Sequence, residues 1–279
     1  MKSKTIYLPQ INYSLRKFFT ILFFISIAIS AKAQHLTHDV GLFVGTATLQ
    51  TDYGQRDNFL SSYGNSTFSL SLVHYLHFFN IDTRWNSEKD FANHLMIKTE
   101  FNIMTKNSFI NHGSYTVGNN PLAVQLRVMK GTLSLSSFGV QGEYYFKDLR
   151  EFMFPYSEMK WNPFISLGFK FSNYTNTLTS DLGDWRTDIT VLPEKYRDPG
   201  HLAVGSGTSF SLILGAGTRY KLSEKFDLAG IFNWQYFFSD AVDGLQADVL
   251  ENKNNEWLIH LQVGIIYHLN FSGGIFCKK

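Results

Sequence analysis

The stretch of sequence that decides the fold lies near the C-terminus and reads Glu256-Trp257-Leu258-Ile259-His260-Leu261-Gln262-Val263-Gly264-Ile265-Ile266-Tyr267-His268-Leu269-Asn270-Phe271. Every odd position from 257 to 271 is apolar or aromatic, whereas the even positions include His260, Gln262 and His268. Strands of soluble proteins usually hold about 5–6 residues, so an alternation that continues over this whole stretch is too long for one. A strand with one apolar and one polar face is typical of a transmembrane β-barrel, which has lipid outside and a polar lumen inside.

The N-terminus carries the features of a secretory signal peptide. Basic residues up to Lys17 precede the apolar run 18–29, and Ala31-Lys32-Ala33 follows it, which predicts cleavage before Gln34. The apolar run is shorter than the roughly 20 residues that a transmembrane helix needs. We therefore expect residues 1–33 to be removed and residues 34–279 to form one outer-membrane β-barrel domain, with the barrel proper at about 38–271.

The composition agrees with a barrel and excludes several classes of protein. Phe, Trp and Tyr make up 16% of the chain, yet the mean hydropathy is only −0.11. Five of the 25 Lys and Arg residues precede residue 34, whereas none of the 23 Asp and Glu residues does, so the mature chain has a net charge of −3. Without a basic excess, the chain is not expected to bind nucleic acid. Cys277 is the only cysteine, which excludes an intramolecular disulfide and a thiolate metal cluster.

Seven further segments show the same alternation, at 40–50, 67–77, 95–103, 132–146, 164–174, 210–221 and 227–237. Together with the C-terminal strand they predict an all-β fold, an antiparallel up-and-down transmembrane barrel of eight strands. In the fourth segment the alternation changes phase near Ser136-Ser137, which predicts a β-bulge at that point.

The lengths of the connections agree with this count. With both termini in the periplasm, the outward connections are long, at 51–66, 104–131, 175–209 and 238–255. The connection 222–226 is tight, as a periplasmic turn should be, whereas 78–94 and 147–163 are longer than usual. Ten strands would result if the loop 175–209 held a further hairpin.

Aromatic residues gather near the predicted strand ends, at the level that lipid headgroups would occupy. They are Tyr144, Tyr145, Phe146, Trp161, Tyr174, Trp234, Tyr236, Phe237, Phe238, Trp257, Tyr267 and Phe271. The alternative is a soluble β-sandwich or lipocalin-like binding protein, in which such residues would fill a small core. The length of the strands favours the membrane barrel.

Six charged residues occupy positions that the alternation assigns to the lumen: Lys98, Glu100, Glu143, Lys170, Arg219 and Asp227. The interior of an eight-stranded barrel is just wide enough for side chains to fill, and an unpaired buried charge is strongly destabilising. We therefore expect a sealed, polar lumen in which these charges form a structural network. A small gated pore is the alternative, and the equal numbers of positive and negative charges favour the sealed lumen.

Several short motifs stand in the first part of the mature chain: His38-Asp39-Val40-Gly41, Phe43-Val44-Gly45, Thr51-Asp52-Tyr53-Gly54-Gln55-Arg56, Gly64-Asn65 and His74-Tyr75-Leu76. With Val263-Gly264-Ile265-Ile266-Tyr267 near the C-terminus, they resemble an uncharacterised family of outer-membrane barrels in Bacteroidota. The resemblance implies the barrel fold and the outer-membrane location, and it brings no catalytic or binding residue with it. The chain departs from the usual aromatic C-terminal ending, because it continues for eight residues past Phe271.

Motifs for cofactors, metals and catalysis are incomplete. Gly205-Ser206-Gly207 and Gly215-Ala216-Gly217 lack the third glycine and the following helix of a dinucleotide-binding motif. Histidines 35 and 38, and histidines 74 and 77, are three residues apart, and such side chains point to opposite faces of a strand. His112-Gly113-Ser114 holds a close His/Ser pair in an outward loop, which makes a lipid-modifying enzyme a further alternative. We predict no catalytic residue, no cofactor and no metal ligand.

The longest outward loop, 175–209, is the candidate for surface binding, because long loops on rigid scaffolds commonly carry recognition. Its candidate contact residues are Asp184, Trp185, Arg186 and Arg197. The sequence thus predicts an outer-membrane protein of structural or surface-binding type that is not an enzyme. The expected partners are outer-membrane lipid, the barrel-assembly machinery and an envelope protein or surface ligand.

Overall fold

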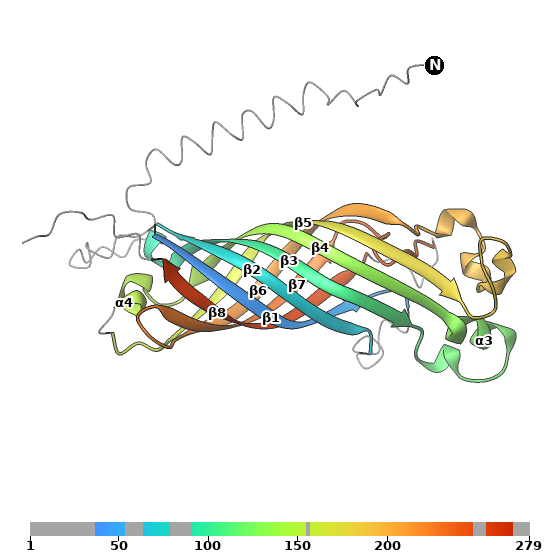
Figure 1. Ribbon diagram of the computed structural model, residues 1–279, viewed down its shortest axis with the longest axis horizontal. Coiled ribbons are helices and arrows are strands. Elements are labelled where there is room, and N and C mark those ends of the chain that lie inside the picture. The colour runs from blue at the N-terminus through green and yellow to red at the C-terminus, as the bar shows by residue number, and fades with distance from the viewer. Residues whose placement is uncertain (1–36, 54–63, 79–90, 155–156, 248–254, 270–279) are drawn as a thin grey trace, which may run out of the picture. The chain divides into compact units, whose positions relative to one another are not determined.

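Eight antiparallel strands close into a barrel in which each strand pairs with its neighbours along the chain and β1 pairs with β8 (Figure 1). The strands are β1 Thr37–Gln50, β2 Ser66–His77, β3 Leu95–Ile110, β4 Met129–Tyr145, β5 Trp161–Ser180, β6 Ser206–Lys221, β7 Phe226–Phe237 and β8 Trp257–Leu269. This computed structural model describes residues 37–53, 64–78, 91–154, 157–247 and 255–269, so the predicted signal peptide lies outside the described residues. The predicted all-β barrel of eight strands is confirmed.

The ten-strand alternative is wrong. Residues 181–205, between β5 and β6, hold three short 3-10 helices, η4 Ile189–Val191, η5 Glu194–Tyr196 and η6 Pro199–His201. The backbone at this connection makes only isolated bridges, Ser180 with Gly183 and Leu202 with Leu245. The longest loop therefore adds no hairpin to the barrel wall.

The connections divide the barrel into two ends. The loop end holds the connections β1–β2, β3–β4, β5–β6 and β7–β8, with η3 Ser114–Thr116 and α3 Pro121–Val128. The turn end holds the start of β1, the end of β8 and the other three connections, with η2 Phe91–His94 and α4 Leu149–Met153. The helices α3 and α4 lie at opposite ends of the barrel (Figure 1). The β6–β7 turn is tight, as predicted, because the backbone amides of Leu222 and Ser223 both donate to the carbonyl oxygen of Phe226.

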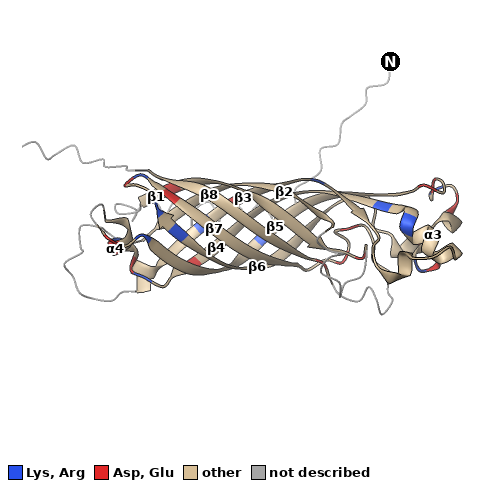
Figure 2. Ribbon diagram, turned by 90° about the horizontal axis from the view of Figure 1, so that it is seen from below, with Lys and Arg blue, Asp and Glu red and all other residues tan. Residues whose placement is uncertain are grey.

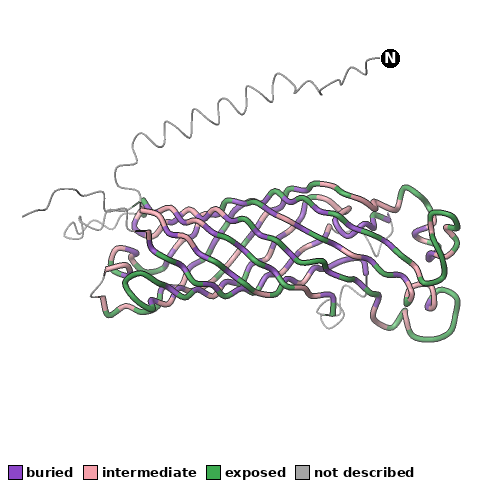
Figure 3. Tube along the Cα trace, viewed as in Figure 1, coloured by how far each residue is buried: buried purple, intermediate pink, exposed green. Residues whose placement is uncertain are grey.

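Buried and more exposed residues alternate along the strands, as the period of two in a β-strand requires (Figure 3), except at the register shift in β3 and at the end of β1. On β5, the outer face presents Ile165, Leu167, Phe169 and Phe171, which are 36–61% exposed, whereas Ser166, Lys170 and Ser172 are buried inside. Apolar residues outside and polar residues inside are stable where lipid surrounds the barrel. This arrangement does not fit the soluble, lipocalin-like alternative, whose interior would be apolar.

The apolar outer face has the height of a membrane. On β5 it runs from the exposed Trp161 to Phe171. At about 3.3 Å per residue and a strand tilt of about 40°, ten residues rise about 25 Å along the barrel axis, the usual height of the apolar band in such barrels. We call this band of outward side chains the apolar belt.

Beyond Phe171 the two faces of the wall exchange character. The outer face of β5 continues with Asn173, Thr175, Thr177 and Thr179, whereas Tyr174 and Leu178 are buried on the inner face. The strands β3, β4 and β5 hold 16, 17 and 20 residues and extend into this region, whereas β2 and β7 hold 12 residues each. We call residues 105–110, 129–136, 173–180 and 206–208 the loop-end extension.

The bulge predicted in β4 near Ser136-Ser137 is wrong, because β4 alternates without interruption. Leu133 and Leu135 point inwards, so the change of phase in the sequence reflects the exchange of polar and apolar faces. The register does shift on the partner strand β3, between Met104 and Asn107, opposite these two leucines.

Most of the aromatic residues predicted at the strand ends lie on the outer face. The rings of Trp161 and Tyr220 are 4.8 Å apart at the turn end, and those of Phe226 and Tyr267 are 5.1 Å apart. Three residues differ from the prediction, because Tyr145, Tyr174 and Phe237 point inwards and are buried. Phe271 lies outside the described residues. No helix in the described ranges has the length and the apolar character needed to cross a membrane.

Candidate functional site in the barrel lumen

The centre of the lumen holds a cluster of four charged side chains, Lys98, Glu100, Glu143 and Lys170, each at most 1% exposed. Lys170 Nζ lies 2.9 Å from Glu100 Oε1, and Lys98 Nζ lies 3.4 Å from Glu100 Oε2 and 3.5 Å from Glu143 Oε1. Glycine is required at position 139, because a Cβ there would lie 2.4 Å from Lys170 Cγ. The four residues, from β3, β4 and β5, form one connected network, the central lumen cluster.

Neutral side chains complete the coordination of Glu100. The side-chain amide of Gln141 donates to Glu100 Oε2 at 2.9 Å, and the hydroxyl of Ser71 donates to Glu100 Oε1 at 3.0 Å. Buried charges persist in proteins when they are paired and when their remaining hydrogen-bonding capacity is met. Both conditions hold for this carboxylate.

A second charged cluster lies nearer the turn end and centres on Asp39. Arg219 Nη1 lies 3.3 Å from Asp39 Oδ2 and 3.8 Å from Asp227 Oδ2. His77 Nε2 lies 2.7 Å from Asp39 Oδ2, and the two ring nitrogens of His268 lie 2.9 Å from Asp39 Oδ1 and 3.2 Å from Asp227 Oδ2. In Figure 2, blue and red segments, which mark Lys, Arg, Asp and Glu, lie within the barrel strands as well as in the loops.

The tyrosine rings of β2 and β4 join the two clusters. The guanidinium carbon of Arg219 lies 4.1 Å from the centre of the Tyr75 ring and 5.4 Å from that of Tyr145, distances at which a cation is attracted to an aromatic face. The Tyr145 hydroxyl in turn donates to Glu143 Oε2 at 2.7 Å. Polar contacts therefore continue from the turn end to the middle of the barrel.

The structure places all six charged residues assigned to the lumen by the sequence inside the barrel, four in the central cluster and two at the turn end. It adds Asp39, His77 and His268, which the sequence analysis did not include in the charged network of the lumen. Extending the alternation of the first segment back by one residue would have placed Asp39 on the inner face, in line with Gly41 and Phe43.

The turn end of the lumen is occupied by apolar side chains and by α4. Leu149 of α4 is buried with Tyr145 and Phe164 in one cluster, against which Met153 also packs. The ammonium group of Lys221 donates to the carbonyl oxygens of Phe152 and Phe154, which holds the C-terminal end of α4 to the end of β6. We call α4 with these contacts the turn-end plug.

The loop end is occupied by a larger apolar cluster, the loop-end core. Strand residues such as Phe109, Leu133 and Leu178 contribute to it, and so does the β5–β6 loop with Leu192 and Tyr196. The β7–β8 loop contributes Val242, Leu245 and Ala247. Two outer loops thus fold over the lumen and bury their apolar side chains against the inner face of the loop-end extension.

Three buried acidic residues of the loop-end connections, Asp52, Asp243 and Glu256, lie close together, a group that the sequence analysis did not predict. The backbone amide of Asp52 donates to Asp243 Oδ2 at 2.8 Å, and that of Asp243 donates to Glu256 Oε1 at 3.4 Å. Burial, together with the nearby charge of Asp52, raises the pKa of Asp243 to about 7. Burial and Asp243 hold the pKa of Glu256 well above its usual range. At least part of this group is therefore protonated at neutral pH.

The four candidate contact residues of the β5–β6 loop separate into two kinds. The guanidinium of Arg186 lies 4.7 Å from the centre of the Trp185 ring, and Asp184 accepts a hydrogen bond from the backbone amide of Arg186. The indole of Trp185 donates to the carbonyl oxygen of Leu178, which fixes the ring to the end of β5. Arg197 donates instead to the carbonyl oxygens of Leu192 and Thr190, so it supports the loop itself.

The two residues weighed for acyl transfer, His112 and Ser114, lie in the β3–β4 connection. Ser114 is exposed at the start of η3, and no hydrogen bond joins it to His112 within the described part of the β3–β4 connection. Catalysis needs a base within hydrogen-bond reach of the nucleophile.

The histidines weighed as metal ligands have other contacts. His38 Nδ1 lies 2.9 Å from His74 Nε2 on the outer face, and His77 contacts Asp39 in the lumen, whereas His35 lies outside the described residues. Among the described residues no group of three or more His, Cys, Asp or Glu side chains is arranged to hold a metal ion.

No family model and no curated protein matches the chain. Among solved structures, the chain is similar to Ail, the attachment invasion locus protein of Yersinia pestis, at 10% identity and a TM-score of 0.42, over 85% of this chain and 100% of that one. It is also similar to Neisserial surface protein A, at 13% identity and a TM-score of 0.43, over 83% of this chain and 97% of that one. A major outer-membrane protein of Thermus thermophilus gives 11% identity and a TM-score of 0.42, over 83% of this chain and 99% of that one.

All three TM-scores lie below 0.5, and the fold follows from the barrel itself. Eight antiparallel strands close without an edge, the outer face carries the apolar belt, and the lumen holds charged and polar side chains. In the bilayer core every backbone polar group must be satisfied within the protein, which a closed barrel achieves. The chain has the fold of an outer-membrane β-barrel.

Proposed function

We propose that the protein is a sealed barrel anchored in the outer membrane, with a structural or surface-binding role and no catalytic activity. The observation that carries this proposal is the filling of the lumen at three levels. These levels are the turn-end plug, the two charged clusters with their tyrosines, and the loop-end core.

The loop end faces the outside of the cell in this proposal. The start of β1, the end of β8 and the tight β6–β7 turn lie at the other end, as on the periplasmic side of bacterial outer-membrane barrels, and the longest loop, 181–205, lies at the loop end, where the long loops of such barrels are extracellular. The Arg186–Trp185 pair then lies on the cell surface, where it is the best placed of the four candidate contacts for an envelope protein or a surface ligand. We further propose that the protein contacts outer-membrane lipid and the barrel-assembly machinery. We also propose that it belongs to the Bacteroidota barrel family, on the motifs quoted in the sequence analysis.

A small gated pore is the competing function, and planar-bilayer conductance separates the two. The mature protein should first show a heat-dependent gel shift, which reports a closed barrel, and should then give no steady conductance. Lys98→Ala should give a conductance only if it loosens the central lumen cluster. Lys130→Ala is the matched control, because Lys130 forms an exposed ion pair with Asp181. A steady wild-type conductance that changes with Lys98→Ala but not with Lys130→Ala would establish the pore instead.

A further inference from the structure

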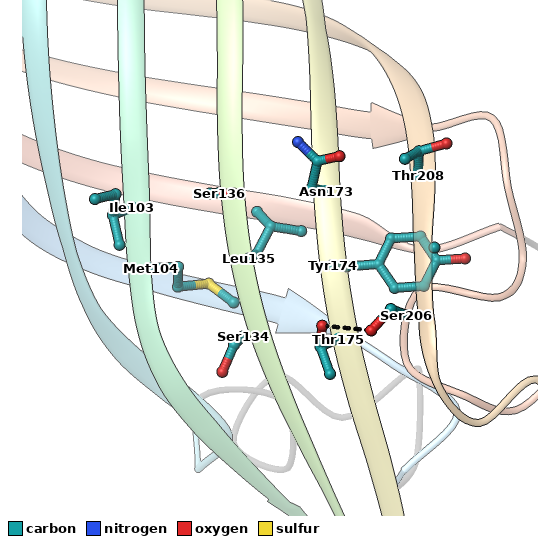
Figure 4. A pocket seen from close by; sticks show the side chains of 11 residues that line it. Ile103, Met104, Ser134, Leu135, Ser136, Asn173, Tyr174, Thr175, Ser206 and Thr208 are labelled. Carbon is teal, nitrogen blue, oxygen red and sulfur yellow. Dashed lines mark hydrogen bonds between the residues drawn. The ribbon is translucent and has the colours of Figure 1, made fainter. Parts of the chain in front are cut away.

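A groove crosses the outer face of the barrel over β3, β4, β5 and β6, at the boundary between the apolar belt and the loop-end extension. It has a volume of about 470 Å³, within the usual size range of small-molecule sites. Figure 4 shows the residues that line it, and Ser134, Ser136, Asn173, Thr175, Ser206 and Thr208 are those with hydroxyl or amide side chains on the outer face.

Cross-strand pairing sets the depth and level of the groove. On its membrane side, Phe138 pairs with Phe171, and Phe171 pairs with Phe210, which forms a raised aromatic row. The next outward row replaces these rings with the small residues Ser136, Asn173 and Thr208, so the surface is hollowed there. The groove therefore begins where the apolar belt ends, at the level of lipid headgroups.

The chemistry of the lining is neutral. No Lys, Arg, Asp or Glu side chain lines the groove, whereas a hydroxyl offers one donor and two acceptors and an amide offers both kinds of group. Thr175 Oγ1 and Ser206 Oγ bond to each other at 2.9 Å (Figure 4). Ser134, Ser136, Asn173 and Thr208 make no side-chain hydrogen bond to the described part of the chain, so their groups face the groove. Ile103, Met104, Leu135 and Tyr174 also line the groove, so its lining is neutral and partly apolar, and it suits a molecule with neutral hydroxyls more than a phosphate.

Neither lysine of the loop-end extension lines the groove, and Lys106 is exposed on β3 at the register shift, outside the lining. Lys130 Nζ lies 2.6 Å from Asp181 Oδ2, beyond the groove toward the loop end. A phosphate-binding site would require a free cation or a cluster of backbone amides, because phosphates are recognised by charge-assisted hydrogen bonds. The hydroxyl lining and the adjoining aromatic row instead match a molecule with a sugar at one end and acyl chains at the other.

We propose that this groove binds the neutral saccharide headgroup of a membrane glycolipid, whose acyl chains lie along the Phe138, Phe171 and Phe210 row. The inference rests on the membrane placement proposed above. It assigns the outer face of β3–β6 a binding role that is separate from that of the loops.

The test uses the full mature chain in phosphatidylcholine nanodiscs that contain a minor fraction of digalactosyldiacylglycerol or of phosphatidylglycerol. Native mass spectrometry after transfer to mild detergent measures the lipid retained by each barrel. Ser136→Leu fills the groove, and Thr46→Leu is the control, since Thr46 is exposed on the outer face of β1. Loss of two or more hydrogen bonds should reduce retention of the galactolipid about tenfold in Ser136→Leu and leave it unchanged in Thr46→Leu.

Equal retention of the galactolipid by both variants would overturn the proposal, and so would retention of phosphatidylglycerol to the same extent. The heat-dependent gel shift keeps the two proposals separable. A wild-type protein that shows no gel shift would contradict the proposed membrane placement. A wild-type barrel that shows the shift but does not retain the galactolipid would contradict only the binding proposed for the groove. If Ser136→Leu does not show the gel shift, galactolipid retention is measured on Asn173→Leu instead, which removes the amide from the same groove.

Discussion

Along β5, the segment from Trp161 to Phe171 and the segment from Asn173 to Ser180 share one backbone geometry and one alternation, yet they present opposite faces to their surroundings. In the first, apolar side chains point outwards and Lys170 points into the lumen; in the second, threonines point outwards and Leu178 points into the loop-end core. A strand has only two faces, so the solvent on each side decides which residues are stable there. The difference teaches that one barrel wall is organised as a membrane protein at one level and as a water-soluble protein at the next.

The largest expected effect comes from the inside of the membrane-level segment. Glu100→Gln removes the carboxylate that pairs with Lys98 and Lys170 and leaves two buried cations without it. We expect the free energy of unfolding to fall by about 3–5 kcal/mol, as it does when one partner of a buried ion pair is lost. Urea titration of the barrel in vesicles, followed by tryptophan fluorescence, measures the change.

The matched control is Asp181→Asn, which breaks the exposed pair with Lys130 at the loop end. Exposed pairs contribute about 1 kcal/mol or less, so this variant should unfold at almost the wild-type urea concentration. Equal effects of the two substitutions would mean that the central lumen cluster is not shielded from water.

The inside of the loop-end extension should respond to lost apolar volume instead. Leu133→Ala opens a cavity in the loop-end core and should cost about 2–5 kcal/mol of local stability. Limited proteolysis should then cut the outer loops faster, while the heat-dependent gel shift remains. Ser134→Ala, one residue along on the outer face, should leave the cleavage rate unchanged.

The outer face should respond to charge in a way that depends on level. Phe169→Lys places an ammonium in the apolar belt and should cost about 2–4 kcal/mol of folding free energy in vesicles. Thr177→Lys lies on the same face of the same strand, beyond the belt, and should change the folding free energy by less than about 0.5 kcal/mol. Similar costs at both positions would remove the boundary that we place between them.

The smallest effect concerns pH at the loop end. Because the pKa of Asp243 is raised to about 7 in the folded protein, its contribution to stability is full below the ordinary carboxyl range and is lost as pH rises through about 7. Glu256, whose pKa is also raised, acts in the same direction. Proteolysis of the outer loops should therefore be faster at pH 8 than at pH 5. Asp243→Asn should reduce this difference, whereas Asp188→Asn, at an exposed carboxylate, should retain it.

Much of the fold could be predicted from the sequence, because lipid outside the barrel and a polar lumen inside it require apolar and polar residues to alternate along each strand. The C-terminal strand and the inward charges of β3 to β7 follow directly from it. The ends of β3, β4 and β5 could not be placed, since the polar–apolar pattern inverts there while the strand continues. The change of phase near Ser136-Ser137 marks this inversion in the sequence, but from the sequence alone it predicts a bulge.

The candidate site was less accessible to prediction than the fold. The alternation of faces along each strand places Lys98, Glu100 and Lys170 in the lumen. Which of these side chains pair with one another depends on the register of three strands. The carboxyl groups of Asp243 and Glu256 come together through loops whose conformation the sequence pattern does not specify. The groove of the outer face depends on cross-strand rows of small side chains, which become visible only when the strands are aligned.

The most direct test of the inverted wall is the water accessibility of β5, measured one position at a time. Cys277 is the only native cysteine, so Cys277→Ser gives a background in which single cysteines can be placed. In membrane vesicles, a membrane-impermeant maleimide should label cysteines at odd positions 173–179 and leave those at odd positions 165–171 unlabelled. Uniform labelling along the whole outer face, or protection at all eight positions, would contradict the account.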